Sequence, residues 1–165
     1  MTVKTEAVSI RTAARPCFFD VTQMAIDLVR ESAIANGLLL VSTSHTTCSV
    51  VIQEESHDVD YYGTEFLLQD LVNVLEEIVP TCKTQGQYLH PGPQHITSAI
   101  NERNEEAWWS LNVDAHLRSV ILGRSVTVPV VDGALLLGEF GRIFFADFDQ
   151  TREREREVRA TVMGE

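Results

Sequence analysis

The stretch SVTVPVVDGALLLGEFGRIFFADF, residues 125–148, decides the fold of this 165-residue chain. It contains three runs of mostly β-branched, apolar or aromatic residues, and Asp132-Gly133 separates the first run from the second. An Asp-Gly pair between two apolar runs is a strong signal for a tight hairpin turn. The stretch therefore predicts a group of antiparallel strands, at 125–131, 135–138 and 143–148.

The rest of the chain mixes helical and extended patterns. An apolar repeat with a period of 3.6 residues predicts a helix, whereas alternation or a β-branched run predicts a strand. The expected helices lie at about 22–35, 60–78 and 114–122, and the expected strands at 2–11, at 38–52 as one strand or two, and in a last segment that ends near 163. Helices interleaved with a hairpin-rich second half indicate the α+β class and exclude a doubly wound sheet.

Length and apolar content predict one domain. A chain of 165 residues with 44% apolar residues fills a single core, so we expect one domain over 1–165. Residues from about 80 to 113 form its least regular part, a long loop that contains the sequence HPGP at 90–93. A connection this long in a compact domain is usually functional or mobile.

Charge and cysteine content exclude several classes of protein. The chain carries 13 Lys and Arg against 24 Asp and Glu, a formal charge of −11, which opposes binding to nucleic acid or to an anionic membrane. No signal-peptide core and no run of ~20 apolar residues is present, so we expect a cytoplasmic protein. Three cysteines without C-x-x-C spacing argue against disulfides and a thiolate zinc cluster.

A polar interruption, STSHTTCS at 42–49, lies inside the extended run. Each hydroxyl or imidazole in a buried strand would need a partner, so this segment is a candidate site. His45 lies within it, and His90 and His116 lie in polar contexts on two other elements. Three imidazoles and a water are a common catalytic zinc set, although spacing alone leaves structural roles for these residues open.

Carboxylates near this segment are candidate partners of the histidines. A carboxylate bonded to the far nitrogen of a ligand histidine fixes its tautomer, a role open to Glu54 and Asp70. Asp70 lies on the apolar edge of its helix, and we expect its side chain to turn inward. A solvated acidic surface is the alternative. Cys48 lies three residues after His45, on the opposite face of a strand, which argues against a cysteine–histidine nucleophile.

The segment TREREREVRA, residues 151–160, alternates Arg and Glu. In an extended segment this places Arg152, Arg154 and Arg156 on one side. A guanidinium grips phosphate or carboxylate with two parallel hydrogen bonds, so this cluster is a candidate anion site. The alternative is a charged edge strand that discourages aggregation.

Several motifs in order resemble those of the YjbQ-like family over most of 38–165. They are SHTTCSVVIQEE (44–55), DLVNVLEEIVP (70–80), YLHP (88–91), DAHLRSVILG (114–123), PVVDGALLLGEF (129–140) and RATVMGE (159–165). The resemblance implies a compact α+β sandwich of mostly antiparallel strands with two or three helices, assembled as a homotrimer.

The resemblance also implies a set of site residues. The expected ligands of a divalent metal, zinc in the first place, are His45, His90 and His116. The expected catalytic residues are Glu54, Asp70 and Arg156. The residues expected to bind substrate are Thr46, Thr47 and Ser49.

Members of that family are often labelled secondary thiamine-phosphate synthase. The resemblance therefore implies a metal-dependent enzyme that acts on a small phosphorylated molecule. Two alternatives stay open: a zinc-dependent hydrolase, because imidazoles suit zinc better than magnesium, and a non-catalytic trimer that binds a small anion. Where the family typically has G-T-W-Q, this chain has Gly138-Glu139-Phe140-Gly141. This departure weakens the inference that the chain shares the family's substrate.

Overall fold

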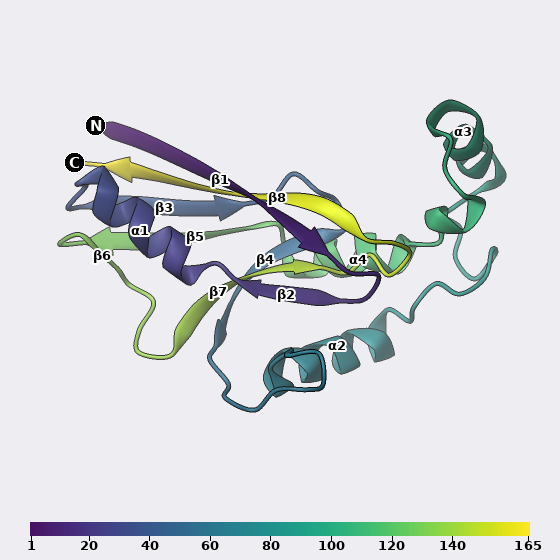
Figure 1. Ribbon diagram of the computed structural model, residues 1–165, viewed down its shortest axis with the longest axis horizontal. Coiled ribbons are helices and arrows are strands. Elements are labelled where there is room, and N and C mark those ends of the chain that lie inside the picture. The colour runs from purple at the N-terminus through teal and green to yellow at the C-terminus, as the bar shows by residue number, and fades with distance from the viewer.

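The computed structural model describes all residues from 1 to 165 as eight strands, four α-helices and one 3₁₀ helix (Figure 1). The elements, in chain order, are β1 (Thr2–Thr12), β2 (Cys17–Asp20), α1 (Thr22–Ser32), β3 (Gly37–Ser42), β4 (Cys48–Glu54), α2 (Phe66–Ile78), α3 (Pro93–Arg103), η1 (Ala107–Ser110), α4 (Val113–Leu122), β5 (Ser125–Val131), β6 (Ala134–Leu135), β7 (Gly141–Asp147) and β8 (Arg154–Gly164).

Two antiparallel sheets enclose the core. The larger has the strand order β1-β8-β3-β5-β6 and the smaller the order β2-β7-β4. Their inner faces bury a shared cluster that includes Leu39 of β3, Val50 of β4, Phe145 of β7 and Val158 of β8, with Leu28 of α1 packed among them. The α+β class and the antiparallel sandwich expected from the sequence are therefore confirmed.

The extended run 38–52 forms two strands in different sheets. β3 pairs with β5 and β8 in the larger sheet, whereas β4 pairs with β7 in the smaller. Residues 43–47, which include most of the polar interruption, make the crossing between the sheets. This explains why polar residues interrupt an apolar run: the crossing leaves the core.

Two helices are shorter than the periodicity predicts. The helix expected from residue 60 begins at Phe66, because Asp60 Oδ1 accepts hydrogen bonds from the backbone N–H of Tyr62 and Thr64 and holds a turn there. The helix expected to reach 35 ends at Ser32, because Ala33 adopts a left-handed conformation, with φ at 55°.

Two short elements, β2 and η1, were not predicted. The four residues of β2 pair with β7 and, like the four of η1, are too few to show a pattern. Within the expected loop, a short polar helix-like run before Trp108 forms α3, which begins with Pro93 in its first turn and ends at Arg103, where Asn104 follows with a positive φ. Figure 1 shows α3 standing away from the sheets, at the end of the molecule opposite to both termini. None of the helices is long and apolar enough to cross a lipid bilayer.

Candidate functional site

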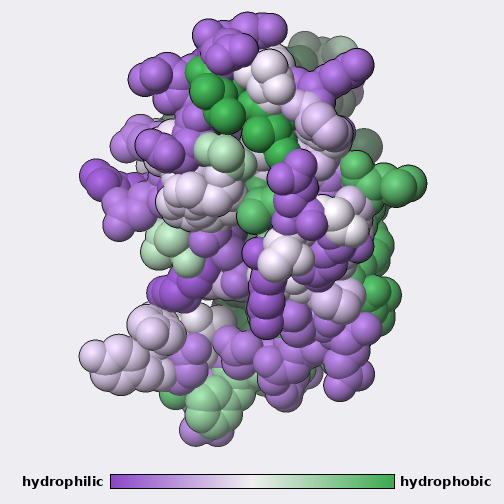
Figure 2. Space-filling view, turned by 90° about the vertical axis from the view of Figure 1, so that its right-hand side faces the viewer, coloured by the Kyte–Doolittle hydropathy of each residue, from purple (hydrophilic) through white to green (hydrophobic).

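A polar cavity of about 300 Å³ opens where the crossing 43–47, the α3–η1 segment, α4 and the start of β8 meet. Only one of its lining residues is hydrophobic. Figure 2 shows the end of the molecule that carries α3, and this face is mostly hydrophilic. The lining residues are Ser44, His45, Thr46, Thr47, His95, Arg103, Glu105, Trp109, Ser110, Asn112, His116, Asp149, Arg154 and Arg156. Such a cavity suits a small polar ligand.

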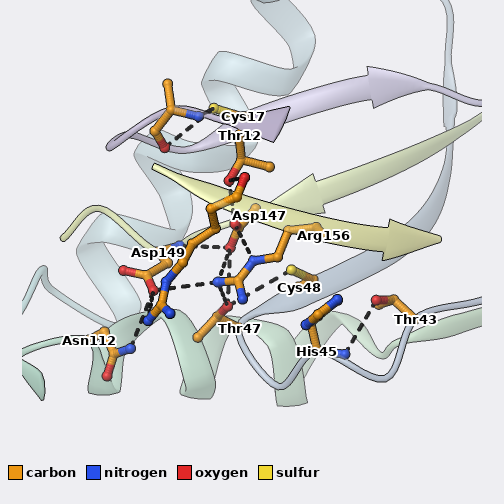
Figure 3. Close-up of polar contacts among 12 residues, drawn as sticks. Thr12, Cys17, Thr43, His45, Thr47, Cys48, Asn112, Asp147, Asp149 and Arg156 are labelled. Atoms are coloured by element: carbon orange, nitrogen blue, oxygen red, sulfur yellow. Dashed lines mark hydrogen bonds and ion pairs between the residues drawn. The ribbon is translucent and has the colours of Figure 1, made fainter. Parts of the chain in front are cut away.

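Arg156 of β8 is held at the floor of this cavity by two buried carboxylates (Figure 3). Its Nε donates to Asp147 Oδ2 at 2.8 Å, and an Nη donates to Thr47 Oγ1 at 2.8 Å and lies 3.4 Å from Asp149 Oδ2. Both carboxylates are fully buried. Burial opposes the charge of Arg156, but the hydrogen bond and the charge of Asp147 raise its pKa. Arg156 is thus primarily a buried structural cation.

Two further arginines line the cavity near its mouth. Arg154 lies 3.5 Å from Asp149 and keeps 28% of its side chain exposed, while Arg103 pairs with Glu105 at 3.3 Å. Together with their ion-pair partners, four arginines (Arg103, Arg152, Arg154 and Arg156) lie against three carboxylates (Glu105, Asp147 and Asp149), before any histidine is counted. In a chain with a formal charge of −11, this local excess of guanidinium groups favours an anion.

One wall of the cavity is made by η1 and stabilised by Arg152. Its guanidinium donates to Glu105 at 2.5 Å and stacks on the ring of Trp109 at 3.8 Å. The indole Nε1 of Trp109 and the hydroxyl of Ser110 are buried without a hydrogen-bond partner. Both residues line the cavity.

The arginine face predicted from 151–160 points inward, toward the cavity. β8 is an inner strand between β1 and β3, so it is not the charged edge strand of the alternative reading.

Three histidine rings gather beside the cavity. The ring centroid of His90 lies 4.5 Å from that of His95 on α3 and 6.2 Å from that of His116 on α4. Nδ1 of His116 donates to the carbonyl of Thr46 at 3.1 Å, which leaves its Nε2 free. Burial, followed by the neighbouring His95 and His116, lowers the pKa of His90. At neutral pH His90 is therefore an uncharged imidazole.

His45 lines the same cavity but its ring is held elsewhere. Its Nε2 accepts a hydrogen bond at 2.9 Å from the backbone N–H of Glu157, so Nδ1 carries the proton. Burial and then the charge of Arg156 lower the pKa of His45. The structure thus brings His90 and His116 together as expected, but it places His95, not His45, in ring contact with His90.

The three clustered imidazoles do not form a metal site as they are arranged. No group of three His, Cys, Asp or Glu could hold a metal ion. The imidazoles themselves are suitable donors, and rings that share a zinc ion at Zn–N of about 2.1 Å have centroids about 5 Å apart, between the two separations observed. The hydrogen bond from His116 to a backbone carbonyl is also typical of a zinc ligand. The imidazoles are thus chemically suited to zinc, but their present arrangement does not form a site for the ion.

Several of the residues expected at the site lie outside the cavity. Glu54 is exposed at the end of β4, and Asp70 is exposed on α2, so its expected inward orientation is not found. Ser49 is fully buried in β4, while Thr46 and Thr47 do line the cavity. Cys48 is buried, and burial raises the pKa of its thiol, in agreement with its exclusion as a nucleophile.

The departure at Phe140-Gly141 lies away from the histidines. β4 and β7 pair from Cys48 with Asp147, beside the cavity, to Glu54 with Gly141, six residues along and therefore about 20 Å away. A Cβ on Gly141 would come within 2.1 Å of the carbonyl oxygen of Leu137. The backbone here excludes the glutamine that the family pattern would place at Gly141.

Three residues of the cavity and its network were missed in the sequence: Asp147, Asp149 and His95. The two aspartates follow an apolar strand, FFADFD, and their alternation with Phe148 was a usable signal for two inward carboxylates. His95 lies in the segment expected to be irregular, where no periodicity indicates which side chains face inward. Trp109, which the sequence placed near the site, does line the cavity.

The fold and the cavity together define an antiparallel α+β sandwich with a polar, arginine-lined cavity. The family model described as "UPF0047 protein YjbQ-like" matches residues 6–165. The chain belongs to this family.

Relatives and solved structures agree with that assignment. The chain is 34% identical over 164 residues to a UPF0047 protein of Methanothermobacter thermautotrophicus, covering 99% of this chain and 94% of that protein. It is 35% identical over 153 residues to a UPF0047 protein of Archaeoglobus fulgidus, covering 93% and 98%. A crystal structure of a hypothetical protein from Aeropyrum pernix K1 superposes with a TM-score of 0.72 at 28% identity, covering 98% of this chain and 99% of that one. An uncharacterized yjbq/upf0047 protein from Clostridium acetobutylicum shares the fold, with a TM-score of 0.71 at 22% identity and coverage of 96% and 99%.

Proposed function

We propose that this protein is a metal-dependent enzyme that acts on a small phosphorylated molecule bound in the arginine-lined cavity. The observation that carries the proposal is the placement of Arg103, Arg154 and Arg156 around one polar cavity in a strongly acidic chain. Guanidinium groups recognise phosphate oxygens by paired, charge-assisted hydrogen bonds.

The residues in and beside the cavity have different parts in this proposal. Arg154 and Arg103, which are partly exposed, contact the phosphate, whereas Arg156 is fixed by Asp147 and adds its positive charge from the floor. His90 and His116 provide imidazole ligands for a divalent ion, zinc in the first place. A zinc ion bound there would act as a Lewis acid toward a phosphoryl oxygen.

The specific reaction that we propose is of the secondary thiamine-phosphate synthase type. The bond between pyrophosphate and the methylene carbon of the pyrimidine breaks, and the ring nitrogen of the thiazole phosphate forms a bond to that carbon. The negative charge that develops on the departing oxygen needs fixed positive groups, and arginines held in place by ion pairs lose little free energy to reorganisation.

One observation favours the non-catalytic alternative, a small-anion-binding protein. The cavity is lined by Glu105 and Asp149, but both are paired with arginines, and Glu54 and Asp70 lie outside it. A free carboxylate that could serve as general base is therefore lacking in one copy of the chain. Zinc-dependent hydrolysis, in which the metal would activate water, is the remaining alternative.

We also propose that the protein is a homotrimer. The single chain exposes several apolar side chains, among them Val120 (79% exposed) and Ile121 on α4 and Ile52 on β4. Glu54 lies two residues from Ile52, on the same face of β4. A catalytic role for Glu54 therefore requires a second copy that brings it to a neighbouring cavity.

A turnover assay tests the proposal. Protein stripped with chelator and reloaded with zinc or magnesium is incubated with pyrimidine pyrophosphate and thiazole phosphate, and separately with a panel of phosphate and carboxylic esters, with His116→Ala as the control. Metal-dependent coupling that His116→Ala loses supports the synthase reaction. Hydrolysis of the panel alone supports the hydrolase, and binding without turnover of any substrate contradicts the enzyme.

A further inference from the structure

We infer that Trp109 and Ser110, in the 3₁₀ helix η1, bind a planar ring of the ligand, one that carries a hydrogen-bond acceptor such as a ring nitrogen or a carbonyl oxygen. This inference rests on the phosphorylated ligand of the proposed function and concerns the part of that ligand beyond the phosphate. It requires neither a metal ion nor a reaction.

The first argument is the composition of the cavity wall at η1. Trp109 is the only hydrophobic residue among those that line the cavity. All the other lining side chains are polar or charged, so an apolar part of a ligand has one place to lie, against the indole. Planar aromatic rings pack on an indole in offset or edge-to-face arrangements that a saturated ring does not gain from. The wall therefore favours a planar ring.

The second argument is the hydrogen bonding of the same wall. The indole N–H of Trp109 and the hydroxyl of Ser110 are buried without a partner, and Ser110 as a whole is only 4% exposed. Buried polar groups in folded proteins nearly always have a partner, and an indole N–H can only donate. An alkyl group offers no acceptor, and a hydroxyl group offers too little apolar surface. An unsaturated ring with a nitrogen or a carbonyl oxygen supplies both.

The third argument is the connection between this wall and the phosphate end of the cavity. Arg152 lies on the ring of Trp109 at 3.8 Å and donates to Glu105 at 2.5 Å. Glu105 also accepts a hydrogen bond at 3.3 Å from Arg103, which we propose contacts the phosphate. The hydrogen bond from Arg152 lowers the pKa of Glu105 more than burial raises it, so this carboxylate is charged at neutral pH. One carboxylate thus links the indole wall to a phosphate-binding arginine.

The size of the cavity limits the ligand. About 300 Å³ is at the lower end of the range for small-molecule sites. The cavity therefore suits one phosphate joined to one ring, and it is too small for a dinucleotide.

Binding of matched phosphate esters tests this inference. The probes are inorganic phosphate, cyclohexylmethyl phosphate, benzyl phosphate and the three isomeric pyridylmethyl phosphates, with affinities measured by calorimetry at neutral pH. In wild type we expect benzyl phosphate to bind at least about fivefold more tightly than cyclohexylmethyl phosphate. We expect one pyridyl isomer to bind about fivefold more tightly than benzyl phosphate, which is the factor that one net hydrogen bond supplies.

Variants separate the ring contact from the hydrogen bonds. Trp109→Leu should abolish the preference for benzyl over cyclohexylmethyl phosphate, whereas Trp109→Phe should keep it and lose the pyridyl preference. Ser110→Ala should weaken binding of the best pyridyl isomer without loss of thermal stability, because it removes a hydroxyl that has no partner in the free protein. Trp108→Leu, at an exposed tryptophan outside the cavity, is the matched control and should change no affinity.

Fluorescence supplies a second readout. The chain has two tryptophans, so Trp108→Phe leaves Trp109 as the only one, and we expect benzyl and pyridylmethyl phosphates, but not inorganic phosphate, to change its emission at saturation. Equal binding of all the phosphates by wild type, or a ring preference that survives in Trp109→Leu, would overturn the inference and leave the phosphate site of the proposed function in place. A wild type that binds none of the phosphates would overturn both.

Discussion

Arg156 Nε and Asp147 Oδ2 are joined by a 2.8 Å hydrogen bond, and both side chains are buried at the base of the cavity. Asp149 and Thr47 complete this network (Figure 3). The relationship changes the role expected of Arg156. Its first task is to neutralise two buried carboxylates, and the cavity above it depends on that neutralisation.

Removal of Arg156 should therefore reduce stability. Arg156→Ala leaves Asp147 and Asp149 buried without their main cation, and we expect a loss of about 3–5 kcal/mol in the free energy of unfolding, measured by urea denaturation. Arg159→Ala is the control, because Arg159 lies on the same strand with 54% of its side chain exposed and should cost less than about 0.5 kcal/mol. Equal effects of the two substitutions would contradict the structural role.

Removal of Arg103 should weaken anion binding and leave stability unchanged. A lost charge-assisted hydrogen bond corresponds to about 1.5–3 kcal/mol, so we expect Arg103→Ala to raise the Kd for inorganic phosphate roughly tenfold or more in calorimetry. Arg124→Ala, an exposed arginine outside the cavity, should leave the Kd unchanged. A phosphate affinity insensitive to Arg103→Ala would exclude Arg103 from the site.

The lowered pKa of His45 predicts a specific pH dependence of stability. The unfolded chain takes up a proton near pH 6.5, whereas the folded chain resists protonation at His45 until a lower pH. The contribution of His45 to the free energy of unfolding is thus fully present above about pH 6.5, and it is lost as the pH falls through the pKa of His45 in the folded state. We expect His45→Gln, which cannot titrate, to flatten the decline of unfolding free energy below pH 6.5 in urea titrations at several pH values. An unchanged slope would show that His45 is protonated as easily in the folded state.

Gly141→Ala should destabilise the fold without affecting the cavity. Its Cβ would collide with the carbonyl of Leu137, and relief of such overpacking costs about 1–3 kcal/mol. The control is Phe140→Leu, at the neighbouring exposed position. Gly86→Ala is not a suitable control, because Gly86 has a positive φ. Thermal unfolding and phosphate calorimetry measure the two effects. Weakened phosphate binding in Gly141→Ala at full stability would place the turn at 138–141 in the site.

The sequence pattern predicted the α+β class and its antiparallel strands because these signals are local, whereas the sandwich was expected from the family resemblance. The Asp-Gly turn at 132–133, the alternation in 2–11 and the arginine alternation in 151–160 each depend on neighbouring residues, and each is found in the structure. The inward orientation predicted for Asp70 was wrong. A position at the edge of an apolar stripe does not specify a partner for the carboxylate, and the structure places no partner beside it. The contact of His90 with His95 depends on the path that the chain takes from His90 into α3, which periodicity does not encode.

The central claim, that the arginine-lined cavity binds a phosphorylated molecule, is tested most directly by a titration of isotopically labelled protein with inorganic phosphate, followed by NMR. We expect saturable shifts confined to the amides that surround the cavity, at 44–47, 103–112 and 149–156. Shifts that do not saturate, or that are centred on another part of the molecule, would contradict the claim.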